Sequence, residues 1–157
     1  MSRNLYEDDR ITAFGLFAEA YTGLSARFAA QFAAHGLSPV EFEVLIRLAR
    51  SANHELRMTD LAAQTSLSTS GVTRVVDRME RDGLVLRRAC PTDRRSSFTV
   101  VTAAGMARLN ETLPGHLALI EKWFTGLLAG DQLTNLLTGL RTIRDAVAPD
   151  ATSGAGS

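Results

Sequence analysis

The sequence contains a single cysteine, Cys90, and three histidines that lie far apart. One cysteine cannot close an intrachain disulfide or build a cysteine-rich zinc site, and no histidine stands at a metal-binding spacing such as HExxH. Long apolar runs are also missing, since none approaches the ~20 residues of a membrane-spanning helix. We therefore expect no metal site and no membrane segment.

The motifs of common enzyme classes are missing too, because the sequence has no GxGxxG, no P-loop and no GxSxG. We therefore expect neither an enzyme nor a bound cofactor. Residues 1–10 are polar and acidic and lack the apolar stretch of a signal peptide, so the expected location is the cytoplasm. Hydrophobic residues make up 45% of the chain, which is enough for a folded core.

The formal net charge is zero, but the charges are unevenly distributed. Residues 47–95 contain ten arginines and six acidic residues, which makes this segment +4 (10 − 6) and the remainder −4. A basic centre between acidic ends is expected where only the centre meets nucleic-acid phosphates. An ordinary solvated surface explains this charge distribution equally well. The choice between it and a nucleic-acid-binding surface therefore depends on the sequence motifs.

Apolar residues at three- and four-residue spacing predict long helices at both ends of the chain. One covers residues 9–34, and a second helical region covers 103–147, where Leu113-Pro114-Gly115 predicts a kink or a break. The N-terminal stripe is aromatic and has no partner nearby in the sequence, so it must pack on the C-terminal helices or on a second subunit. We expect both regions to be dimerisation helices, and residues 148–157 to be a disordered tail.

Capping signals divide the segment between these helices. Ser38-Pro39-Val40-Glu41 combines a capping box with proline at the first helical position, and predicts a helix to about residue 51. Thr59 is expected to cap a short helix over 60–65, and Ser68 to cap a second helix that runs to residue 82. A short strand is expected around residues 56–58.

A β-hairpin is predicted directly after the second short helix. Residues 84–89 and 96–102 are rich in β-branched or apolar side chains and flank a polar turn at 90–95. The predicted fold is therefore mainly α with a small β-hairpin wing (α+β). A winged helix-turn-helix over residues 38–102 is flanked by the N- and C-terminal dimerisation helices.

The second short helix is the expected major-groove reader, since two short helices joined by a tight turn form a helix-turn-helix. Its hydroxyl side chains allow a close backbone approach, and Arg74 can donate both arms of its guanidinium to guanine. Arg78 can reach a phosphate or pair with Asp77 or Asp82. The residues expected to contact DNA from this helix are Ser68, Thr69, Ser70, Thr73, Arg74 and Arg78.

The predicted hairpin places Asp93, Arg94 and Arg95 at its tip. Arginine side chains on a narrow tip suit the minor groove, and Asp93 is expected to orient one of them through a salt bridge. A charged turn that faces only solvent is the alternative. The basic tip follows directly after a serine-capped helix that carries Arg74, which favours the DNA interpretation.

Residues 67–105, LSTSGVTRVVDRMERDGLVLRRACPTDRRSSFTVVTAAG, strongly resemble the MarR family of bacterial transcriptional regulators, including its SlyA-like members. The segments LSPVEFEVLIRLAR and MTDLAAQTS also fit. The resemblance implies a homodimer, and a repressor is the expected regulator. It further implies that Ser68, Ser70, Thr73 and Arg74 meet the major groove of a pseudo-palindromic operator. Asp93, Arg94 and Arg95 would serve the minor groove.

The resemblance also implies a cleft for a small phenolic or carboxylate ligand between the dimer helices and the winged domain. The aromatic candidates are equally explained as dimer core, and the arginines as surface or phosphate-facing residues. The candidate lining residues are Tyr21, Phe28, His35, Arg47, Arg50 and Trp123.

Two alternative functions stay open at this point. One is a redox-responsive regulator that uses Cys90, whose pKa the neighbouring Arg87 and Arg88 would lower. The other is a winged-helix module that binds protein and not DNA, in which case Arg74 and Arg94 would be dispensable.

Overall fold

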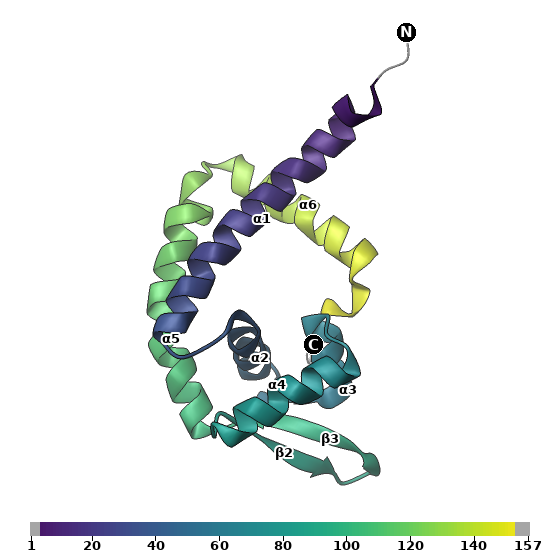
Figure 1. Cartoon of the computed structure of the whole chain (residues 1–157), viewed down its shortest axis with the longest axis vertical. Coiled ribbons are helices and arrows are strands. Elements are labelled where there is room, and N and C mark those ends of the chain that lie inside the picture. Colours follow the sequence, from purple (N-terminus) through teal and green to yellow (C-terminus); the bar gives the residue numbers. More distant parts are fainter. Residues whose placement is uncertain (1–3, 153–157) are drawn as a thin grey trace.

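The computed structural model describes residues 4–152, and Figure 1 shows an elongated α1 beside a small winged head. Six α-helices and three strands are formed in this part of the chain. Short 3-10 turns cover Leu5–Glu7, Ala52–His54, Thr125–Leu127 and Pro149–Thr152. The helices are α1 (Asp9–Ala34), α2 (Pro39–Ala49), α3 (Met58–Thr65), α4 (Thr69–Arg81), α5 (Ala103–Trp123) and α6 (Asp131–Val147), and the strands are β1 (Glu55–Arg57), β2 (Val85–Cys90) and β3 (Asp93–Val101).

The three strands form one antiparallel sheet in the order β1-β3-β2. Thr99 stands at its centre, opposite Leu56 on one side and Arg87 on the other, and is fully buried. The predicted hairpin is thus confirmed, and the short strand before α3 joins it as a third strand. Because β1 leads directly into α3, the sheet ties the hairpin to the helix-turn-helix.

The predicted capping box at the start of α2 is confirmed by two hydrogen bonds. The Ser38 backbone N–H donates to Glu41 Oε2 at 2.8 Å, and the Glu41 N–H donates to Ser38 Oγ at 3.3 Å. Ser68 caps α4 as predicted, accepting the N–H of Gly71 at 3.1 Å. The cap predicted at Thr59 is wrong, because α3 already begins at Met58 and leaves Thr59 inside the helix.

A kink or a break was predicted near Pro114, and the break is wrong, since α5 continues through the proline as one helix. Proline lacks the N–H that would bond to the Asn110 carbonyl one turn earlier. Gln31 of α1 contacts the helix close by, where its side-chain N–H donates to the Thr112 carbonyl at 3.0 Å. This hydrogen bond ties α5 to α1 beside the proline.

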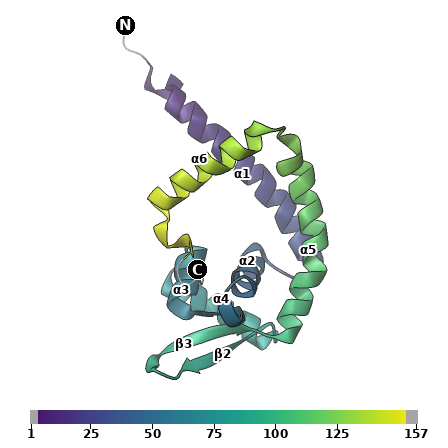
Figure 2. The same ribbon diagram turned by 180° about the vertical axis from the view of Figure 1, so that it is seen from behind.

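The C-terminal segment is ordered further than the sequence predicted. Residues 149–152, expected to belong to a disordered tail, form a 3-10 turn that packs against α3. Arg47 Nη1 donates to the Ala151 carbonyl at 3.0 Å. The remainder of the predicted tail lies outside the described residues. In Figures 1 and 2 the chain accordingly returns from α6 to the head, close to α3.

Most of the hydrophobic core lies in the head, which comprises residues 38–102, and Phe32 of α1, Leu37 and Leu109 of α5 extend it. Helices α2, α3 and α4 interlock over the sheet, and their buried side chains include Leu45, Leu48, Leu61, Val72, Val76 and Met79. By contrast, α1 and α6 expose large apolar side chains over much of their length. No helix within residues 4–152 is long and apolar enough to cross a membrane.

An aromatic cluster around His116 of α5 joins α1 to α2. The His116 ring centroid lies 4.7–4.8 Å from those of Phe28 and Phe32 on α1 and of Phe42 on α2. Burial lowers the pKa of His116, and its Nδ1 makes no hydrogen bond in the structure. A proton on this ring would place a charge among three benzene rings without a paired acceptor, which is unfavourable.

His116 therefore predicts that acid destabilises the fold. The pKa of His116 lies below its ordinary value of 6.5 in the folded chain, so the free energy of unfolding should fall as the pH drops below about 6.5. One proton limits this slope to about 1.4 kcal/mol per pH unit. Urea unfolding over this range measures it, and His116→Phe, which cannot bind a proton, should flatten it. Identical slopes for the two proteins would contradict the prediction.

Candidate nucleic-acid interface

Helix α4 presents its amino-terminal end to solvent, as the sequence predicted. Ser68, Thr69 and Ser70 are all exposed, and the Ser68 and Ser70 hydroxyl oxygens lie 3.2 Å apart. Thr73 is half-buried and donates its hydroxyl to the Thr69 carbonyl at 2.8 Å. These short side chains leave the first turn accessible, and its free N–H groups favour an anion.

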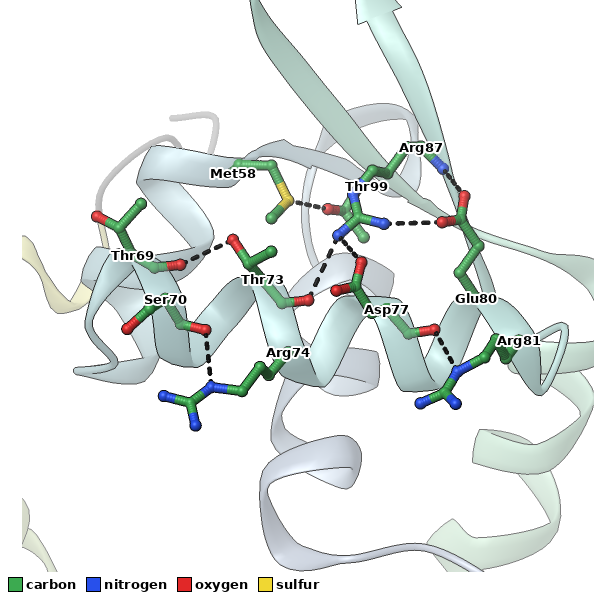
Figure 3. Close-up of polar contacts among 10 residues, drawn as sticks. All are labelled: Met58, Thr69, Ser70, Thr73, Arg74, Asp77, Glu80, Arg81, Arg87 and Thr99. Carbon is green, nitrogen blue, oxygen red and sulfur yellow. Dashed lines mark hydrogen bonds and ion pairs between the residues drawn. The ribbon is translucent and has the colours of Figure 1, made fainter.

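Arg74 and Arg81 extend from the side of α4 opposite to the hairpin (Figure 3). Each side chain makes a long contact with its own helix, from Arg74 Nε to the Ser70 carbonyl and from Arg81 Nε to the Asp77 carbonyl, both at 3.4 Å. Both are exposed. The residues predicted from the sequence did not include Arg81, although Arg81 lies seven residues after Arg74 and therefore two helical turns along the same face.

Arg78 pairs with neither of the acids that the sequence suggested. Its Nε donates to Glu41 Oε1 at 2.6 Å, which joins α4 to the capping box of α2. Burial by itself would raise the pKa of Glu41, but hydrogen bonds from Ser38 and the Arg78 ion pair outweigh it, and the pKa is lowered. The Arg78 side chain stays 47% exposed, so its outer nitrogens still face solvent.

The turn of the hairpin is shorter than predicted. Strand β2 extends to Cys90 and β3 begins at Asp93, with a register irregularity there, so the turn consists of Pro91 and Thr92 and not of residues 90–95. Asp93 Oδ1 accepts the Arg95 backbone N–H at 2.9 Å, where the sequence predicted a salt bridge. Arg94 and Arg95 lie on β3 beside the tip and are exposed.

Arg87 on β2 connects the hairpin to α4 (Figure 3). Its guanidinium lies 2.6 Å from Asp77 Oδ1 and 2.7 Å from Glu80 Oε2. Nη2 also approaches the Thr73 carbonyl at 3.4 Å, and the Arg87 backbone N–H donates to Glu80 Oε1 at 3.0 Å. No local sequence pattern predicts this cluster, because it forms only when the hairpin folds back on α4.

Cys90 is buried at the end of β2, where its sulfur lies 3.3 Å from the Thr92 hydroxyl. Hydrogen bonds with Thr92 lower the pKa of the thiol, and Arg57 adds a smaller effect. The sequence assigned this effect to Arg87 and Arg88, which is wrong: Arg87 is bound to the acids of α4, and Arg88 pairs with Glu55 at 2.7 Å.

The six predicted ligand-pocket residues do not come together in one cavity. Tyr21 and Phe28 line a cavity of about 830 Å³ between α1, α2, α5 and α6. Trp123 lines an adjoining pocket of about 360 Å³, which shares Leu24 and Phe124 with the larger cavity. His35, Arg47 and Arg50 line neither of these cavities, and Arg47 is instead held by Glu43 and the Ala151 carbonyl. The described residues contain no group of three or more acidic, histidine or cysteine side chains placed to hold a metal ion.

Comparison with known proteins identifies the family. Residues 35–96 match the model of the MarR family. Over 114 residues the chain is 32% identical to the HTH-type transcriptional regulator MhqR of Bacillus subtilis, an alignment that covers 73% of this chain and 77% of MhqR. The chain belongs to the MarR family.

Two solved structures show the same fold. AbsC, a MarR family transcriptional regulator from Streptomyces coelicolor, has a TM-score of 0.86 and 32% identity, covering 93% of this chain and 98% of AbsC. Sco3205 from the same organism was solved in complex with DNA, with a TM-score of 0.84 and 28% identity, covering 88% of this chain and 91% of Sco3205. The predicted fold class, mainly α with a small β wing, is thereby confirmed.

The Glu41–Arg78 pair predicts a specific loss of stability. Glu41→Gln keeps an acceptor for the Ser38 N–H but removes the charge opposite Arg78, so the free energy of unfolding should fall by about 1–2 kcal/mol. Urea unfolding measures this. Glu43→Gln is the matched control on the same helix, because its partner Arg47 is a partly exposed i,i+4 neighbour and the expected loss is below about 0.5 kcal/mol. Equal losses would show that the Arg78 contact contributes nothing.

Proposed function

We propose that this chain is a homodimeric, sequence-specific double-stranded DNA-binding transcriptional regulator, and that it acts as a repressor. The observation that carries the proposal is the free face of α4: an exposed serine- and threonine-rich first turn, followed by Arg74 and Arg81 on one side. Within residues 4–152, neither of these two guanidiniums forms an ion pair with an acidic side chain. A helix with such a face suits the major groove.

In this proposal the head, residues 38–102, is the DNA-binding domain. Helix α4 reads base edges through Arg74, and Ser68, Thr69, Ser70 and Thr73 approach the backbone and bases near the helix start. Arg78 reaches a phosphate with the nitrogens that Glu41 leaves free, and Arg94 and Arg95 on the hairpin enter the minor groove. The DNA complex of the relative Sco3205 supports a DNA-binding role for this fold.

The arms, residues 9–34 and 103–147, are proposed to form the dimer. Phe14, Phe17 and Tyr21 lie along one stripe of α1 and are 70%, 51% and 66% exposed. Consecutive rings in this stripe lie 6.4 Å apart. An apolar surface this continuous is unfavourable in water and marks an interface. Two copies joined there would read a pseudo-palindrome, and a dimer seated on a promoter would exclude polymerase.

A small phenolic or carboxylate ligand is proposed to release the DNA. The cavity that Tyr21 and Phe28 line is the larger of the two and also touches Pro39 at the start of α2. A ligand there would contact the arms and the head at once. It could therefore change the angle between the two heads of a dimer.

Arg74→Ala should reduce sequence preference. Losing a bidentate base contact costs about 1–3 kcal/mol for the preferred sequence and less for other sequences, because phosphate contacts remain. The measurement is fluorescence anisotropy with a duplex selected from a random pool, at two salt concentrations. Arg10→Ala is the control, since Arg10 lies in α1 and pairs with Asp8.

Wild-type protein that binds no duplex, or binds without salt dependence, would overturn the proposed function. Arg74→Ala and Arg94→Ala variants with full biological activity would instead favour a protein-binding module.

Phe14→Asp should produce a folded monomer. The side chain is exposed within one chain, so the substitution leaves the head intact but places a charge in the proposed interface. Light scattering after gel filtration measures the mass. Thr12→Asp, on the exposed opposite face of the same helix, should remain dimeric. Binding to a two-half-site duplex should weaken roughly a hundredfold in the monomer, because the second half-site is no longer tethered. A dimeric Phe14→Asp protein would place the interface elsewhere.

A further inference from the structure

Helix α4 carries two carboxylates, although it is proposed to meet a polyanion. The side chains of Asp77 and Glu80 are 52% and 40% exposed. Negative charges that approach phosphates weaken association, because like charges repel most strongly where water is displaced from a contact. The position of these acids therefore requires a counter-charge that stays with them when the helix enters DNA.

Arg87 supplies that counter-charge from the hairpin. It bridges both acids, with Nη2 at 2.6 Å from Asp77 and Nη1 at 2.7 Å from Glu80. Both Glu80 oxygens are engaged, one by the guanidinium and the other by the Arg87 backbone N–H. The planar fork of arginine suits such double recognition, which a lysine cannot reproduce.

The same contacts fix the position of α4 relative to the wing. Thr73, Asp77 and Glu80 lie on successive turns of the helix, and Arg87 touches all three (Figure 3). One strand residue thus holds two turns of the helix. A rotation or sliding of α4 against β2 would break several of these contacts together.

Arg87 is poorly placed to bind DNA itself. Its side chain is 27% exposed, and both terminal nitrogens are turned toward α4. Arg74 and Arg81 extend from the opposite side of the helix. An arginine already paired with two carboxylates neutralises no phosphate and so releases no cations from the DNA, and the cluster of Arg87, Asp77 and Glu80 carries a net charge of −1 (1 − 2).

We propose that Arg87 acts on DNA binding through Asp77 and Glu80: it masks both carboxylates from the phosphates, without contacting DNA itself. The inference rests on the proposed function. It divides the arginines of the head into those proposed to contact DNA and Arg87, which acts by neutralising the carboxylates of α4.

The first test compares Arg87→Gln with the triple variant Arg87→Gln/Asp77→Asn/Glu80→Gln. Affinity is measured by anisotropy on the duplex selected with wild-type protein. Arg87→Gln exposes two unpaired carboxylates and should weaken binding on the order of tenfold, whereas the uncharged triple variant should return to within about threefold of wild type. The control is Arg88→Gln on the same strand, whose partner is Glu55, with an expected change below about threefold.

Recovery in the triple variant is the decisive result, because neutralising the acids cannot restore a lost DNA contact. Unchanged affinity of Arg87→Gln would overturn the proposal. So would a triple variant that stays weak, with the slope of log K against log salt reduced by about one per subunit, since that marks a lost phosphate contact. Far-UV circular dichroism checks that each variant is folded.

The second test keeps Arg87 and so does not depend on the folding of Arg87→Gln. Asp77→Asn/Glu80→Gln leaves no carboxylate for Arg87 to mask, so its affinity should stay within about threefold of wild type and its salt slope should not change. A slope steeper by about one per subunit would overturn the proposal, because it would place Arg87 at a phosphate. Wild-type protein that binds no duplex would overturn the proposed function and this inference with it, whereas a failed rescue with normal wild-type binding removes the inference alone.

Discussion

The buried carboxylate of Glu41 is the contact on which the arrangement of the head depends. It accepts the Ser38 N–H at 2.8 Å and Arg78 Nε at 2.6 Å, so one side chain both starts α2 and holds α4. A carboxylate in this position is tolerated only when such partners surround it. The next residue, Phe42, stacks on Phe32 of α1 with ring centroids 4.1 Å apart. Two consecutive residues therefore connect the arms to the proposed DNA-reading helix.

Local signals allowed much of this fold to be predicted from the sequence. The capping box at Ser38 and the cap at Ser68 each satisfy helix-end groups with residues three positions away, so their geometry is contained in a short segment. The sequence-based predictions were wrong where contacts with residues distant in the chain determine the local structure. Helix α5 continues through Pro114 where α1 lies beside it, and Asp93 is drawn into a strand by pairing with Cys90 of β2. Neither partner is visible in the local pattern.

The residues of the candidate site fall into the same two groups: some follow from the local sequence, and others depend on tertiary contacts. Arg74 was predicted because a helix face is periodic, and that periodicity also pointed to Arg81. The partner of Arg78 lies 37 residues away, and Arg87 acts through a hairpin that must fold first, so both depend on tertiary structure. The ligand-pocket candidates failed to converge because the relative placement of α1, α5 and α6 decides which of their aromatic residues share a cavity.

The turn at Pro149–Thr152 has a mechanical consequence. Because it rests on α3 and Ala151 is held by Arg47, helix α6 is attached to the rest of the chain at both of its ends. A helix attached at both ends has fewer independent motions than a helix attached at one end. We expect a swing of the head that leaves this attachment intact to bend the chain at the corner between α5 and α6, where Gly130 adopts a φ of +50°.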